Sequence, residues 1–157
     1  MIYIGIDPGK EGGIAWQQQK GETITVKAIK MPDTLRDLHD ILNELSQADL
    51  LKSCAIEKVA GRYGMSARSA FTFGYQFGIV CTAVVCNRIP MRLISPQRWQ
   101  KEFGLIMDGN VSRTVKKNRH KKVAQELFPQ IEKMTHHIAD ALLICEWWRL
   151  YHQAKTK

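Results

Sequence analysis

Residues 4–15 read IGIDPGKEGGIA. The run up to Ile6 is apolar and predicts a buried strand, whereas residues 7–13, DPGKEGG, are dense in turn-forming types. A second strand-like run, IAWQQQ, begins at residue 14, and a third, ETITVKAI at residues 22–29, alternates in the manner of an outer strand. Three strands joined by such short turns are expected to form an antiparallel meander, with Asp7 at the end of the first strand.

The rest of the chain predicts alternating helices and strands. Apolar residues recur at helical spacing from an expected N-cap at Asp33 to about Gln47, and a short strand at residues 54–57 then ends on Glu57. The further expected elements are a helix at 66–86, a strand at 91–94, a helix at 95–103, a helix ending at 127 and a last helix at 137–152. This order describes an α/β fold with a mixed five-stranded sheet, an antiparallel meander followed by parallel crossovers, flanked by helices.

The predicted helix at residues 66–86 has a stripe of small residues. Ser66, Ala70, Gly74, Gly78 and Thr82 fall four residues apart and therefore share one face. Two interpretations remain open: the stripe packs on the sheet, or it meets the same stripe of a second copy across a two-fold axis.

Length and charge narrow the class of protein. A chain of 157 residues fits one domain, residues 1–157, and its 45% apolar and 24% charged residues are ordinary for a folded globular protein. The formal net charge of +8 attracts polyanions. Nucleic acid is the leading candidate partner, and an anionic membrane surface is the second.

The cysteines and the apolar runs favour a cytoplasmic location. Four cysteines without a C-x-x-C spacing are expected to be buried free thiols in a reducing compartment. We expect no secretory signal, and the longest apolar stretch, around residues 77–86, is shorter than the ~20 residues that span a bilayer. The host would be a bacterial or phage-infected cell, or an organelle.

Four side chains form a candidate active site: Asp7, Glu57, His137 and Asp140. If the strands that end on Asp7 and Glu57 are neighbours, the two carboxylates emerge side by side, and His137 and Asp140 share a face of the last helix. A cluster rich in anionic oxygen repels itself unless cations occupy it, and oxygen ligands suit Mg²⁺ or Mn²⁺. Two such ions stabilise the attacking and leaving oxygens of a phosphodiester, which predicts hydrolysis of a nucleic-acid backbone.

Each of these residues also has a structural explanation of its own. Asp7 before Pro-Gly can open a turn, Glu57 can be a surface carboxylate, and His137 can pack near a helix start. Asp140 is harder to explain in this way, because it lies in the apolar run IADALLIC and a buried unpaired carboxylate is costly. The combination, rather than any single residue, indicates a site.

Longer motifs point to a family. They are IEKV around Glu57, SPQRWQKEFGL at 95–105, HKKVAQELFP at 120–129 and HHIADALLICEW at 136–147. With IGIDPGKEGGIA they span most of the chain. In their order and separations they resemble the RuvC-type Holliday junction resolvases, above all the phage and organelle branch of that family.

The resemblance implies a ribonuclease-H-like fold, a homodimer, and paired symmetric nicking of four-way DNA junctions with two divalent ions per active site. The ions would be Mg²⁺, with Mn²⁺ able to substitute. Asp7, Glu57 and Asp140 fall on the acidic positions of the family, and His137 falls where members have an acid or a histidine. If His137 must be neutral to bind a metal, activity is expected to fall in mild acid. Neither a membrane nor a small molecule is expected as a partner.

Basic residues are the candidate DNA contacts. Eight of them lie between residues 98 and 122 against two acids, and such a run is ordinarily a solvated helix face. Beside a nuclease site we expect it to bind the DNA backbone without sequence information. The full set of candidates is Lys58, Arg62, Tyr63, Arg68, Arg98, Lys101, Arg113, Lys116, Lys117, Arg119, Lys121 and Lys122.

The loop after Glu57 departs from the family pattern. Related resolvases present an aromatic residue soon after the catalytic glutamate, to prop open the junction centre, and the corresponding residue here is Ala60. Tyr63, by stacking on an opened base, or Arg62 would have to serve instead.

Three other functions would share some of these sequence features. A broader nuclease acting on forks, flaps and three-way junctions would have the same fold and site. Actin-like sugar kinases and chaperone ATPases also begin with a strand, an aspartate and a glycine loop, but they need a second comparable domain. A catalytically silent junction-binding protein would not need all four candidate ligands.

Overall fold

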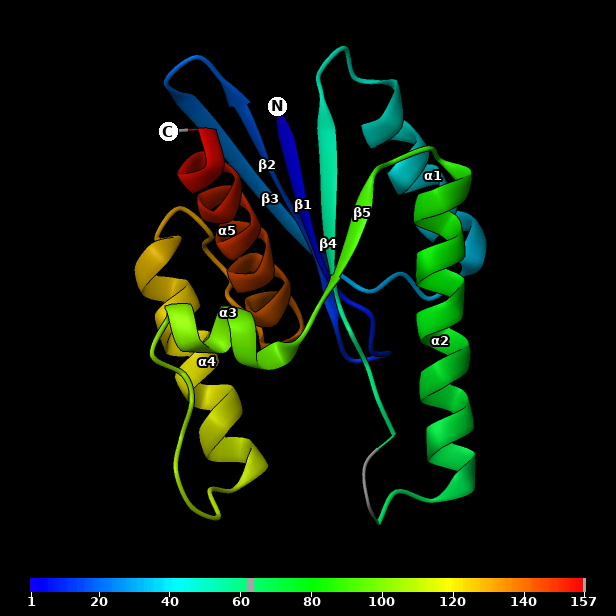
Figure 1. Ribbon diagram of the computed structural model, residues 1–157, viewed down its shortest axis with the longest axis vertical. Helices are drawn as coiled ribbons and strands as arrows, with labels where there is room; N and C mark the ends of the chain where they lie inside the picture. Colours follow the sequence, from blue (N-terminus) through cyan, green and yellow to red (C-terminus); the bar gives the residue numbers. More distant parts are fainter. Residues whose placement is uncertain (62–63, 157) are drawn as a thin grey trace.

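A mixed five-stranded sheet forms the centre of the computed structural model, which describes residues 1–61 and 64–156 (Figure 1). Its strands are β1 (Ile2–Asp7), β2 (Gly13–Lys20), β3 (Thr23–Lys30), β4 (Lys52–Glu57) and β5 (Met91–Ile94). They lie in the order β3-β2-β1-β4-β5, with β1, β2 and β3 antiparallel and with β4 parallel to both β1 and β5. The predicted meander and parallel crossovers are confirmed.

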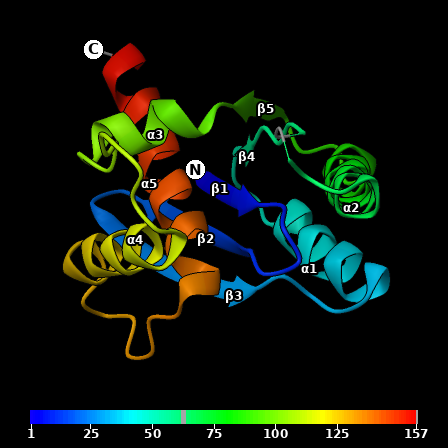
Figure 2. The same cartoon turned by 90° about the horizontal axis from the view of Figure 1, so that it is seen from below.

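Helices cover both faces of the sheet (Figure 1). One face has α1 (Leu35–Gln47) and α2 (Ala67–Cys86), and the other has α3 (Pro96–Glu102), α4 (Arg113–Leu127) and α5 (His136–Thr156). The view from below in Figure 2 separates these two groups. All the helices were predicted, although α5 is longer than expected at its C-terminal end.

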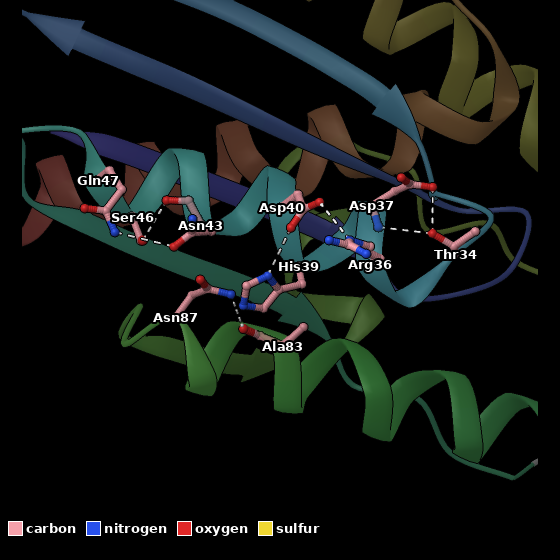
Figure 3. Close-up of polar contacts among 10 residues, drawn as sticks. All are labelled: Thr34, Arg36, Asp37, His39, Asp40, Asn43, Ser46, Gln47, Ala83 and Asn87. Carbon is pink, nitrogen blue, oxygen red and sulfur yellow. Dashed lines mark hydrogen bonds and ion pairs between the residues drawn. The ribbon is translucent and has the colours of Figure 1, made fainter.

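The N-cap of α1 differs from the prediction by one residue. The Thr34 hydroxyl accepts a hydrogen bond from the backbone N–H of Asp37 at 3.1 Å (Figure 3), so Thr34 and not Asp33 is the cap. The Asp33 carboxylate is instead paired with Lys30 at 3.1 Å. Aspartate and threonine can both cap a helix. Here the Asp33 carboxylate is paired with Lys30, and the Thr34 hydroxyl forms the cap.

Side chains of the central strands alternate between two cores, because successive residues of a strand point to opposite faces. On β1, Ile6 is buried with residues of α1 and α2, whereas Tyr3 is buried with residues of α5. Ala55 of β4 is also buried on the α5 side. The same alternation directs Asp7 and Glu57, at the ends of β1 and β4, to the α5 face.

Two glycines allow the backbone of α5 to lie directly on the sheet. A Cβ atom added to Gly5 would stand 2.3 Å from the backbone nitrogen of Cys145, and one added to Gly13 would stand 2.6 Å from the carbonyl oxygen of His137. Both distances are too short for any side chain. The start of α5, with Asp140, is thereby held close to the end of β1.

Helix α2 lies at the outer side of the fold (Figures 1 and 2) and is mostly exposed. Its buried residues are Val80 and Val84. The stripe from Ser66 to Thr82 is exposed along its whole length, and Cβ atoms added to Gly74 or Gly78 would meet open space. The interpretation in which the stripe packs on the sheet is therefore wrong. Among the described residues, α2 is also the one helix long and apolar enough to cross a membrane, with 11% of that stretch buried.

All four cysteines are free, as predicted, but their burial differs. Cys54 and Cys145 are buried, whereas Cys81 is partly exposed and Cys86 is exposed. The expectation of buried thiols is wrong for Cys86, because it lies on the outward side of α2.

Candidate active site

Three carboxylates from three elements lie on the α5 face at one end of the sheet. Asp7 ends β1, Glu57 ends β4, and Asp140 is near the start of α5. Strands β1 and β4 are parallel neighbours with Ile6 opposite Ile56, so Asp7 and Glu57 follow at the same level. The structure thus meets the condition on which the candidate site depended, that these two strands are neighbours.

The pKa values of the two strand carboxylates are raised, although the charge of Lys117 opposes the shift at both. Burial, followed by the negative charge of Asp140, raises the pKa of Asp7. Burial, followed by the negative charge of Asp7, raises the pKa of Glu57 to about 7. Asp140 acts on Glu57 in the same direction, so the three carboxylates form one electrostatic cluster.

Asp140 differs because two basic side chains from α4 hold it. Lys117 Nζ lies 2.6 Å from Oδ2, and His120 Nδ1 lies 2.7 Å from Oδ1. Burial alone would raise the pKa of Asp140, but the hydrogen bond from His120 and the charge of Lys117 outweigh burial and lower it. The pKa of Lys117 is raised in turn: burial opposes this shift, and the charge of Asp140 outweighs burial.

Glu57 has an indole partner. The Trp99 side chain, on α3, donates its Nε1–H to Glu57 Oε2 at 2.8 Å, and Trp99 is almost completely buried. Sequence reasoning missed Trp99 and His120, and it assigned Lys117 to DNA alone. For Lys117 and His120, helical spacing could have indicated a common role, because these two residues and Ala124 share one face of α4. That face is the one that packs inward, since His120 and Ala124 are the buried residues of the helix.

The fourth predicted ligand, His137, points elsewhere. Its Nδ1 lies 2.9 Å from the carbonyl oxygen of Glu11 and 3.5 Å from the Glu11 carboxylate, in the turn that follows Asp7. A pocket of about 350 Å³ adjoins this contact. Its lining residues are Glu11, Arg113, Thr114, Lys117, His136 and His137.

The donor set suits a hard divalent cation in chemistry but is not gathered around a single point. Within residues 1–61 and 64–156, no three His, Cys, Asp or Glu side chains converge closely enough to hold a metal ion. The reason lies in the contacts above, since Asp140 is engaged by Lys117 and His120 while His137 turns to Glu11. The raised pKa values of Asp7 and Glu57 nevertheless mark a place where a cation would relieve repulsion between buried carboxylates.

Most of the predicted DNA contacts are exposed side chains, but Lys117, Arg119 and Lys122 have protein partners, Glu126 at 4.0 Å in the case of Lys122. Lys117 is paired with Asp140, and Arg119 Nη2 donates to the carbonyl oxygen of Gly104 at 2.7 Å. Arg62 and Tyr63 lie outside the residues that the structure describes. The exposed candidates are Lys58, Arg68, Arg98, Lys101, Arg113, Lys116, Arg119 and Lys122, and Lys121 is partly exposed.

Comparison with known sequences finds a relative. No protein-family model matches the chain. The chain is 26% identical over 151 residues to the crossover junction endodeoxyribonuclease RuvC of Rhodopirellula baltica, which covers 90% of this chain and 82% of the relative.

Comparison with solved structures finds the same fold. Thermus thermophilus RuvC in complex with a Holliday junction substrate matches with a TM-score of 0.67 at 17% identity, over 99% of this chain and 98% of that one. A second Thermus thermophilus RuvC structure matches over the same shares with a TM-score of 0.61. Fowlpox virus resolvase with Holliday junction DNA matches at 0.50 and 14% identity over the whole of both chains. The chain is thus similar in sequence to RuvC and shares the fold of these RuvC structures.

Proposed function

We propose that this protein is a metal-dependent DNA endonuclease that resolves four-way junctions by paired symmetric nicking. The single observation that supports this most is the buried cluster of Asp7, Glu57 and Asp140 on the face where α5 meets β1 and β4. These residues are the ones on which the family resemblance and the strand topology agree. We propose that the whole chain acts as one nuclease domain, in the cytoplasm of a bacterial or phage-infected cell.

Asp7, Glu57 and Asp140 would hold two divalent cations, Mg²⁺ or in its place Mn²⁺, with His137 as the fourth ligand. Bound there, the cations would activate water and stabilise the leaving oxygen of a phosphodiester. His137 is supported by its place one helical turn before Asp140 and by its 40% exposed side chain, which lines the adjoining pocket. The contact of Lys117 with Asp140 gives that carboxylate a counter-charge that a metal ion would replace.

The basic residues of α3 and α4 would bind the DNA backbone beside this cluster. Arg113 and Lys116 are exposed on the same helix whose Lys117 reaches Asp140, so phosphates bound there lie next to the carboxylates. Electrostatic contacts of this kind position the DNA without reading its sequence. Lys58 and Arg68 would contact DNA from the other side of the cluster, where the chain leaves β4 and enters α2.

A second copy would cover the exposed face of α2. Phe71, Tyr75 and Val85 are 75%, 59% and 60% exposed, which is unusual for large apolar side chains on a single helix. The stripe of small residues beside them permits close approach of another helix. A two-fold axis there would give the two active sites that symmetric nicking requires. A bilayer is the weaker alternative, because Val80 and Val84 fix α2 to the core formed with β1 and α1.

The decisive experiment uses a mobile four-way junction, with each strand labelled in turn. Wild-type protein with Mg²⁺ is expected to make symmetric nicks in two strands of like polarity, and EDTA is expected to abolish them. Asp7→Asn is expected to abolish nicking while the junction is still bound in a gel-shift assay. Forks, flaps and three-way junctions in the same assay test the broader nuclease: comparable rates on all of them would favour it over the resolvase.

A further inference from the structure

Two of the three carboxylates are joined through a pair of aromatic rings. Trp99 donates to Glu57 Oε2 at 2.8 Å, and His120 lies 2.7 Å from Asp140 Oδ1. The two rings contact each other edge to face, with centroids 5.3 Å apart and planes at 77°. An unbroken path of side chains therefore runs from Glu57 on β4 to Asp140 on α5.

The path is buried and comes from elements that do not contribute the carboxylates. Trp99 lies on α3 and is 1% exposed, and His120 lies on α4 and is 7% exposed. Side chains enclosed in this way have little rotational freedom, so the hydrogen bonds they make are fixed in direction. Each ring engages one oxygen of its carboxylate and leaves the second oxygen outside that bond, and on Asp140 the second oxygen is the one that meets Lys117.

We propose that Trp99 and His120 are positioning residues, which orient Glu57 and Asp140 so that one oxygen of each is presented to the divalent cations. The inference rests on the proposed function, because it gives the ring pair a role toward the metal site. Partners of this kind, one bond removed from the metal, orient the ligand carboxylates, and their loss typically reduces metal affinity or activity about 10- to 100-fold. Neither residue belongs to the predicted ligand set.

Simple core packing is the competing explanation, and three substitutions distinguish the two. Trp99→Phe keeps an aromatic ring and removes the N–H that holds Glu57. His120→Leu introduces an apolar side chain of similar size and removes the bond to Asp140, whereas His120→Asn retains an N–H near the position of Nδ1. Trp148→Phe is the matched control: Trp148 is 4% exposed and donates its Nε1–H to Ser53 at 3.0 Å, with no contact to the cluster.

The experiment measures Mn²⁺ binding to the full-length protein without DNA, by electron paramagnetic resonance, and the Mg²⁺ dependence of junction nicking. Trp99→Phe and His120→Leu are expected to weaken Mn²⁺ binding about 10-fold or more, and to raise the Mg²⁺ concentration for half-maximal nicking more than they lower the maximal rate. His120→Asn is expected to restore most of the affinity. Trp148→Phe is expected to leave Mn²⁺ binding unchanged.

The outcomes separate this inference from the proposed function. If wild-type protein binds Mn²⁺, Asp7→Asn does not, and Trp99→Phe and His120→Leu both bind as wild type does, the positioning role is overturned and the nuclease site stands. An equal loss in Trp148→Phe would also overturn the positioning role, since it would reflect packing alone. If wild-type protein shows no saturable Mn²⁺ binding, both proposals fail.

Discussion

Replacing Glu57 by glutamine is expected to stabilise the metal-free protein at pH 8. Burial and the charge of Asp7 raise the pKa of Glu57 from its ordinary 4.5 to about 7. That change corresponds to roughly 3 kcal/mol of preference for the protonated form, an upper limit because the protein relaxes around a charge. Glutamine has nearly the same shape, lacks the charge, and can still accept the hydrogen bond from Trp99.

The sign of the pH dependence follows from where the proton is held. Below about pH 4.5 the Glu57 side chain is protonated in both the folded and the unfolded chain, so its contribution is absent. Between pH 4.5 and 7 the unfolded chain loses this proton while the folded chain keeps it, and the free energy of unfolding therefore falls as pH rises. Above pH 7 Glu57 is ionised in the folded protein as well, and the full destabilisation from its buried charge is present. The advantage of Glu57→Gln should thus be small at pH 5 and approach 3 kcal/mol at pH 8.

Urea unfolding in EDTA at pH 5 and pH 8, followed by circular dichroism, measures this difference directly. Glu22→Gln is the control, because Glu22 is exposed on the turn between β2 and β3. Mg²⁺ should stabilise the wild-type protein and reverse part of the difference, since a ligand that binds only the folded state stabilises it. A variant no more stable than wild type at pH 8, or equally stabilised at both pH values, would refute the reasoning.

Three further outcomes are expected. Gly5→Ala should lower the free energy of unfolding by about 3 kcal/mol in urea titrations, because its Cβ collides with the backbone of α5. Gly61→Ala, where an added Cβ meets open space outside α2, should not destabilise the protein, and equal effects of the two substitutions would contradict the close contact at Gly5. Replacing Lys116 and Lys121 by alanine should weaken junction binding and reduce the slope of log affinity against log salt by about 2, and an unchanged slope would exclude them as phosphate contacts. Phe71→Glu should convert a dimer to a monomer in sedimentation velocity, and a dimer that persists would exclude this face of α2.

The sequence was sufficient for the sheet and for part of the site. Local patterns predicted the strands and the antiparallel meander. The adjacency of β1 and β4 was only a condition of the sequence argument, and the structure meets it, which places Asp7 beside Glu57 because parallel neighbours end at one edge. The outward direction of the small stripe on α2 was not predictable, since helical spacing shows which residues share a face but not what that face meets. The N-cap of α1 was off by one residue for a similar reason: Thr34 and Asp33 are both good caps.

The side-chain contacts of Asp140 were the larger omission. Lys117 and His120 lie 23 and 20 residues before it in the chain, on the preceding helix, and only the packing of α4 against α5 brings them together. In sequence Lys117 is one cation in a basic run. Its difference from Lys116 is a matter of helix phase: one side chain turns inward to a buried carboxylate and the other remains in solvent.

The close contact between α5 and Gly5 divides the active site into a part with a fixed backbone and a part that depends on a mobile side chain. Asp7 and Asp140 are carried by β1 and α5, whose backbones approach so closely at Gly5 that no side chain fits between them. Lys117 reaches the cluster through four methylene groups from a separate helix, and its side chain is still 28% exposed. Exchange of its ammonium group for an incoming cation therefore requires side chains to move, Lys117 away from Asp140 and His137 away from Glu11, while the backbone that carries the carboxylates can remain in place.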